Sequence, residues 1–301
     1  MNVLRSAILA AADSPRIQRF VGRYGMRLGA ARFVGGETLD EAVVTLRRLN
    51  EQGLRTNTTL LGEGVQNREA TGRVVEAYEE VLRRIAAEGL QTNVALKLTH
   101  LGVLIDEELA YGNLERLVAA AARLGNFIRI DMEDSPLVDV TLPTYRRLRE
   151  AGHDNVGTVL QAYLYRSEDD LDSLLPLGSN LRVVKGAYRE PSEIAYPRKE
   201  DVDAAYARLV ERSIAEGRFT AVATHDERLI EHAIRLGAGP DRFELQMLYG
   251  VRPQLQLDLV RRGHRVLVAT PYGPDWYPYL MRRLAERPAN LMFFVKSAIR
   301  R

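Results

Sequence analysis

The sequence contains no cysteine among its 301 residues, which excludes disulfide bonds and thiolate metal sites. This absence suits a cytoplasmic location. An excess of one charge sign is missing too, because 42 Lys and Arg face 40 Asp and Glu and leave a formal net charge of +2. Such a small excess gives no reason to expect nucleic acid as a partner.

Long apolar runs are also lacking, and none approaches the roughly 18–20 residues that a membrane-spanning helix needs. The apolar stretch at residues 7–12 ends at Asp13 and is too short for a secretory signal. The chain has no GxGxxG after a strand, no P-loop and no HExxH, and its five histidines lack ligand spacing, so we predict no metal site. Asp131 and Glu133 could face one metal together, but Lys97 and Arg182 would compete with the cation.

Short β-branched or aliphatic runs alternate with longer amphipathic segments, such as 68–88 and 201–216. Glycines at 53, 89, 125, 152, 217 and 263 fit helix C-caps before the next run. We predict eight strands: Thr56–Glu63, Asn93–His100, Phe127–Glu133, Val156–Tyr163, Leu181–Tyr188, Phe219–Asp226, Phe243–Tyr249 and Arg265–Tyr272.

This strand–helix alternation predicts a parallel sheet and an α/β fold. Eight units over about 250 residues favour a (β/α)8 TIM-type barrel. A doubly wound sheet is the alternative, although it would normally have fewer strands or a second domain. We therefore divide the chain into an N-terminal helical arm, residues 1–54, and a (β/α)8 barrel, residues 55–301.

The arm contains a stretch with one apolar and one basic face. Its apolar face holds Ile17, Phe20, Val21, Tyr24 and Leu28, and its basic face holds Arg16, Arg19, Arg23 and Arg27. A helix packed on the barrel with a solvated basic face is one interpretation. An interfacial helix that meets anionic lipid or a partner is the other.

Active sites of TIM barrels lie at the carboxyl ends of the strands. In this chain those ends carry an unusual number of charges, including Lys97, Asp131, Arg182 and Lys185. Buried charges are costly unless they are paired or functional, so this set indicates a polar ligand. Ion pairs between strands, with no ligand, are the alternative for any single residue.

The segment after the last strand places Tyr279, Arg282, Arg283 and Glu286 close to one helix face. Neighbouring Arg282 and Arg283 project about 100° apart and could hold one carboxylate from two sides, a task that suits guanidinium groups. An Arg-Arg pair on its own is more commonly a solvated face.

Seven ordered motifs together resemble proline dehydrogenase, both the short bacterial enzymes and the corresponding domain of bifunctional proline-utilisation flavoenzymes. The similarity extends from about residue 37 to the C-terminus. The motifs are ALKLT at 95–99, RIDMED at 129–134, VLQAYL at 159–164, LRVVKGAY at 181–188, ATHD at 223–226, FELQ at 243–246 and YLMRRLAE at 279–286.

The resemblance implies oxidation of proline to 1-pyrroline-5-carboxylate by hydride transfer from C5 to N5 of non-covalent FAD, with electrons passed to a quinone. This is the first step of proline catabolism to glutamate. It further implies that Arg282, Arg283 and Lys97 bind the substrate, that Asp131 pairs with Lys97, and that Arg182 lies near flavin N5. Residues implied to contact FAD are Met132, Gln161, Lys185, Gly186, Ala187, Thr224 and His225, with Lys199 and Gln246 as further candidates.

Glu63 resembles the family's gating carboxylate, which ion-pairs with Arg282 in the closed site. One departure concerns strand eight, where the family often places a tyrosine against the substrate ring and this chain has Ala269. Either discrimination against hydroxyproline is altered, or Tyr272 takes that place. If the acceptor is a membrane quinone, the basic arm and the apolar residues 291–295 are candidates for a peripheral contact with the inner face of the membrane. A core-facing helix at 291–295 is the other interpretation.

Two other functions stay open on the sequence. A Schiff-base lyase or aldolase could use Lys97 or Lys185 as its nucleophile on the same barrel. A barrel that binds a small carboxylate without catalysis is the third class, and it accounts least well for the clustered interior charges.

Overall fold

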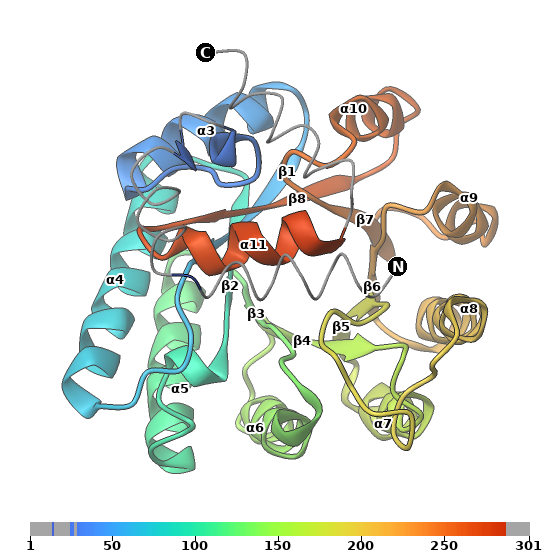
Figure 1. The fold of residues 1–301 in the computed structure, drawn as a ribbon, viewed down its shortest axis with the longest axis horizontal. Helices are drawn as coiled ribbons and strands as arrows, with labels where there is room; N and C mark the ends of the chain where they lie inside the picture. Colours follow the sequence, from blue (N-terminus) through green and yellow to red (C-terminus); the bar gives the residue numbers. More distant parts are fainter. Residues whose placement is uncertain (1–13, 15–24, 27–28, 287–301) are drawn as a thin grey trace.

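The computed structural model describes residues 29–286 together with Ser14, Gly25 and Met26. Eight parallel strands in sequence order close into one barrel, which confirms the predicted fold class. Figure 1 shows helices surrounding this ring of strands. The strands are β1 (Arg55–Leu60), β2 (Thr92–Leu96), β3 (Ile128–Ile130), β4 (Val156–Gln161), β5 (Asn180–Val184), β6 (Phe219–Ala223), β7 (Phe243–Leu248) and β8 (Val266–Tyr272).

Each strand is followed by an α-helix, and one further helix, α3 (Leu39–Glu51), precedes β1 and packs on β1 and β8. Thr38 caps α3 by accepting a hydrogen bond from the Glu41 backbone N–H. The helices after the strands are α4 (Arg68–Ala87), α5 (Glu107–Arg123), α6 (Val138–Glu150), α7 (Ser167–Leu174), α8 (Lys199–Glu216), α9 (Glu227–Arg235), α10 (Pro253–Arg261) and α11 (Trp276–Glu286).

The strands start at or within one residue of the predicted positions, but seven of the eight end one to four residues earlier than predicted. Strand β1 stops at Leu60 rather than Glu63, and β5 stops at Val184 rather than Tyr188. The polar residues that follow leave the hydrogen-bonded ladder and line cavities instead. Of the predicted glycine caps, Gly217 differs, because its φ of −82° is not left-handed.

Helix α11 differs in placement from the helices around the ring, since it crosses in front of the barrel (Figure 1). Its Trp276 and Leu280 pack in a small apolar cluster with Phe33 and Val34, which precede α3. The Trp276 Nε1 donates to Glu37 at 2.8 Å. These contacts hold α11 over the carboxyl ends of the strands. The predicted arm helix and residues 291–295 lie mostly or wholly outside the described residues.

Candidate active site

Two cavities adjoin at the carboxyl ends of the strands. The smaller has a volume of about 330 Å³ and the larger a volume of about 780 Å³. Both are lined by Lys97, Asp131, Arg182, Ala269 and Tyr279. A group in the small cavity would therefore face a group in the large cavity across a wall made of these side chains.

Arg182 in β5 is held from two sides. Its Nη1 donates to Asp131 Oδ1 at 2.6 Å, and its Nε donates to Gln246 Oε1 at 2.6 Å. The side chain is only 10% exposed, so both bonds are shielded from water. Gln246 is fixed in turn, because its Nε2 donates to Glu244 Oε1 at 2.7 Å. The guanidinium is thus set in one orientation at the junction of the cavities.

Lys97 contacts a different carboxylate from the one expected. Its Nζ forms an ion pair with Glu63, which follows β1, whereas Asp131 pairs with Arg182. The expected pairing of Asp131 with Lys97 is therefore wrong in this structure. The reason is geometric, since Asp131 follows β3 directly and faces Arg182 across the barrel interior, while the loop after β1 brings Glu63 to Lys97.

The two carboxylates that could have faced a metal together diverge. Glu133 is buried and accepts hydrogen bonds from the Thr99 N–H at 3.1 Å and the Thr99 hydroxyl at 2.6 Å. Burial raises the pKa of Glu133, an effect that the bonds from Thr99 partly offset. Asp131 instead meets Arg182. Within the described part of the chain, no group of three or more His, Asp or Glu side chains could hold a metal ion.

A cluster of lysines and aspartates borders the large cavity. Lys185 follows β5, and its Nζ contacts Asp203 Oδ1 at 2.5 Å and Asp226 Oδ2 at 3.3 Å. Lys199, at the start of α8, forms an ion pair with the same Asp203. Burial alone would raise the pKa of Asp203, but hydrogen bonds from both lysines bring it below its usual value. Lys185 lines the cavity, although it lies beyond the last residue of β5.

The neutral polar residues of this cavity are also fixed. His225 Nε2 accepts a hydrogen bond from the Leu248 backbone N–H at 2.9 Å, which assigns the proton of a neutral ring to Nδ1. Gln161 donates through Nε2 to the Glu133 carbonyl at 2.9 Å. Gly186 has a φ of 123°, and a Cβ there would lie 2.3 Å from the Tyr163 ring, so only glycine fits.

All seven residues predicted to contact a cofactor line the large cavity: Met132, Gln161, Lys185, Gly186, Ala187, Thr224 and His225. Lys199 and Gln246 line it as well. Sequence reasoning missed Asp203, Arg228 and Arg252. The spacing of Lys199 and Asp203, four residues apart on a helix, is the signal that could have identified Asp203.

Helix α11 contributes the remaining predicted residues. Tyr279 lines both cavities, and Arg283 lines the large one with its guanidinium carbon 5.3 Å from the centre of the Tyr279 ring. The Arg282 side chain lies outside the described residues. Ala269 lines both cavities, whereas Tyr272 is buried and lines neither. Ala269, and not Tyr272, therefore lies beside the small cavity, where a tyrosine against the substrate ring was one expectation.

None of the helices in the described ranges is long and apolar enough to cross a membrane.

Comparison with known proteins gives a consistent picture. Residues 42–296 match the sequence profile of the family described as "Proline dehydrogenase". The chain is 40% identical over 301 residues to "Proline dehydrogenase 2" of Bacillus subtilis subsp. natto, and the match covers 99% of each chain. It is 43% identical over 310 residues to "Proline dehydrogenase" of Deinococcus radiodurans, again with 99% of both chains covered.

The fold is similar to part of a larger solved structure. The structure of proline utilization A from Bdellovibrio bacteriovorus inactivated by N-propargylglycine superposes with a TM-score of 0.82 at 23% identity. The match covers 89% of this chain and 33% of that one. This likeness supports the barrel assignment independently of the closer sequence relatives.

Proposed function

The chain belongs to the proline dehydrogenase family, and from that premise we propose that it oxidises L-proline to 1-pyrroline-5-carboxylate with non-covalent FAD. The observation that carries the proposal is the pair of adjoining cavities with Arg182 fixed at their junction. One cavity has the size for a small amino acid, and the other has the size for a large cofactor.

The residues of the large cavity fit FAD. Its volume of about 780 Å³ lies in the range of ligand sites, which is about 300–1,000 Å³. Lys185 and Lys199 provide positive charge for a pyrophosphate, and α9 begins in the same wall with its backbone N–H groups. When bound, FAD supplies the flavin N5 that accepts the hydride from proline C5.

The small cavity would hold proline. Arg282, Arg283 and Lys97 are the cations proposed to bind the carboxylate, and Glu63, which pairs with Lys97, lines the same small cavity. Fixing the carboxylate sets the ring so that C5 faces the large cavity, and this orientation is the main catalytic contribution of the clamp. Cationic neighbours also favour the neutral amine, whose lone pair must be free to form the imine.

Arg182 has a different role in the proposal. Its guanidinium is already held by Asp131 and Gln246, so it needs no rearrangement to stabilise negative charge that develops in the large cavity during hydride transfer. Asp131 acts by keeping Arg182 in place. These two are the residues that we propose to be catalytic.

Electrons are proposed to pass to a membrane quinone, which makes the reaction the first step of proline catabolism to glutamate. A cytoplasmic enzyme that meets the inner face of the membrane peripherally would suit this acceptor. Flotation with anionic liposomes tests the contact, and a protein that stays at the bottom of the gradient would discard it.

An absorbance spectrum of the purified protein, before and after anaerobic addition of proline, tests the function. Oxidised-flavin bands that bleach with proline are expected. A flavin spectrum that proline leaves intact would remove proline as the substrate, and a colourless protein that binds no added FAD would remove the cofactor.

A Schiff-base enzyme is the second candidate, but the surroundings of both lysines disfavour it. Lys97 and Lys185 contact carboxylates rather than standing in an apolar pocket, which is one arrangement that activates a Schiff-base lysine. Borohydride trapping with substrate would reveal such an intermediate.

A further inference from the structure

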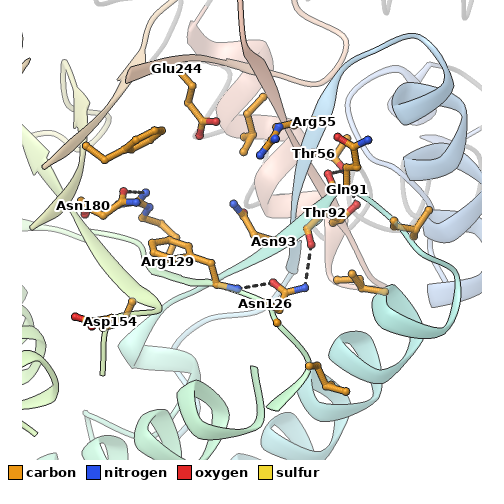
Figure 2. A pocket seen from close by; sticks show the side chains of 18 of the residues that line it. Arg55, Thr56, Gln91, Thr92, Asn93, Asn126, Arg129, Asp154, Asn180 and Glu244 are labelled. Carbon is orange, nitrogen blue, oxygen red and sulfur yellow. Dashed lines mark hydrogen bonds between the residues drawn. The ribbon is translucent and has the colours of Figure 1, made fainter. Parts of the chain in front are cut away.

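A large cavity lies at the opposite end of the barrel from the site described above. It has a volume of about 900 Å³ and is lined by the first residues of several strands and by the loops that lead into them. Figure 2 shows Arg55, Asn93, Arg129 and Glu244, which come from four different strands or their edges, around the same space. None of its lining residues belongs to the proposed catalytic machinery.

The lining is rich in arginine. Five arginines, Arg55, Arg129, Arg149, Arg218 and Arg265, face three carboxylates, Asp154, Asp241 and Glu244. Five positive charges minus three negative charges leave a net charge of +2 on the lining. Two of the carboxylates are already paired, since Glu244 lies 2.8 Å from Arg265 Nε and Asp154 lies 2.6 Å from Arg149 Nη1.

Arg129 is the buried member of this set, with 3% of its surface exposed. Among the described residues, its guanidinium donates to neutral oxygens, namely the Thr158 carbonyl at 2.9 Å, the Asn180 carbonyl at 2.8 Å and the Asn180 side chain. Burial, together with the charge of Arg182, lowers the pKa of Arg129 to about 9. Glu244 and Asp131 act on its charge from a distance, but no carboxylate of the described residues is in contact with the guanidinium, which is unusual for a buried charge.

Two further arginines stand at the edge of the cavity. Among the described residues, neither Arg55 nor Arg218 has a carboxylate within ion-pair distance. Burial, and then repulsion from Arg265, lowers the pKa of Arg55. Asn93 accepts a bond from Asn57 through its Oδ1 at 2.7 Å, which leaves its Nδ2 as a donor toward the cavity (Figure 2).

We propose that this cavity binds a dianionic oxyanion, a phosphate group, between Arg55, Arg129 and Arg218. Guanidinium forks match the oxygens of phosphate in charge and geometry. A dianion would offset the net +2 charge of the lining and supply the missing acceptors. Free phosphate and a phosphate ester share this chemistry, and the cavity has room for either. The proposal is independent of the reaction at the other end of the barrel.

Calorimetric titration of the full-length protein, with its flavin bound, tests the site. Inorganic phosphate and glycerol 3-phosphate are titrated separately at fixed ionic strength, at a pH where both are dianionic. The variants are Arg55→Gln and Arg218→Gln, which change exposed side chains and should fold normally. Arg235→Gln, an exposed arginine of α9 outside the cavity, is the matched control.

We expect saturable binding to the wild type and to Arg235→Gln, and affinity weakened about tenfold or more in Arg55→Gln and Arg218→Gln. Proline turnover should stay unchanged in all three variants. Tighter binding of the ester would identify an ester as the natural ligand, and equal or weaker binding would identify free phosphate. No saturable heat with either anion, or equal affinity in wild type and Arg55→Gln, would overturn the proposal.

Discussion

Replacing Asp131 tests the idea that Arg182 works because it is held in place. The wild-type carboxylate accepts a 2.6 Å hydrogen bond from Arg182 Nη1, and Gln246 accepts one from Nε of the same guanidinium. Asp131→Asn keeps an acceptor but removes its charge, whereas Asp131→Ala removes the acceptor as well. The two variants should therefore form a graded series.

The size of the effect follows from the type of bond. A hydrogen bond to a charged group contributes about 1.5–3 kcal/mol, and a neutral bond contributes about 0.5–1.5 kcal/mol. Because about 1.4 kcal/mol corresponds to a factor of ten in rate, Asp131→Ala should slow flavin reduction about 10- to 150-fold. Asp131→Asn should slow it less, by about 5- to 10-fold, because the amide oxygen still accepts from the charged guanidinium and only the carboxylate charge is lost.

The assay is anaerobic stopped-flow reduction of the flavin over a range of proline concentrations. We expect the limiting rate to fall, with a smaller change in the apparent affinity for proline, because Lys97 pairs with Glu63 and not with Asp131. Asp134→Asn, at an exposed carboxylate three residues further on, is the control. Equal limiting rates in wild type and Asp131→Ala would refute the positioning role.

Three further predictions address other parts of the site and fold. Arg283→Met should raise KM for proline about 10- to 150-fold with the flavin content unchanged, and a normal KM would remove Arg283 from the clamp. His100 is buried, and burial, followed by the charge of Lys97, lowers its pKa from 6.5 to about 4. The unfolded chain therefore takes up a proton between about pH 6.5 and 4 that the folded chain does not, and stability should fall by about 3 kcal/mol across this range. Urea unfolding of His100→Leu should show a flatter profile, and an unchanged slope would contradict the assignment. Ala269→Tyr narrows the small cavity and should lower kcat/KM for hydroxyproline more than for proline, whereas equal losses would show that position 269 does not set ring selectivity.

The order of strands and helices could be predicted because a parallel barrel places short apolar runs between amphipathic segments at regular spacing. The strand ends could not, because residues such as Lys185 continue the sequence pattern after the ladder has stopped. Period-two alternation assigns a face only while the chain is extended. Beyond Val184 the backbone turns, so Lys185 lines the cavity although alternation leaves its direction open.

Pairing between distant charges was harder to predict than the residues themselves. The sequence indicates that Lys97, Asp131 and Arg182 lie together, but the resemblance pairs Asp131 with Lys97, whereas the structure pairs it with Arg182. A sequence shows which charges reach the mouth of the barrel, but several pairings satisfy the same rule that buried charges need partners. Loop geometry after β1, which delivers Glu63 to Lys97, decides among them.

The interior of this barrel explains why so many charges appear inside its strands. Barrel interiors are usually filled by branched apolar side chains, but here polar contacts run from Asp131 through Arg182, Gln246 and Glu244 to Arg265. Hydrogen bonds join Asp131, Arg182, Gln246 and Glu244, so the cost of burying Arg182 is offset by neighbouring side chains rather than by solvent. An apolar interior would leave the guanidinium free to turn toward water. These buried polar contacts therefore keep the positive charge of Arg182 in a fixed position at the junction of the two cavities.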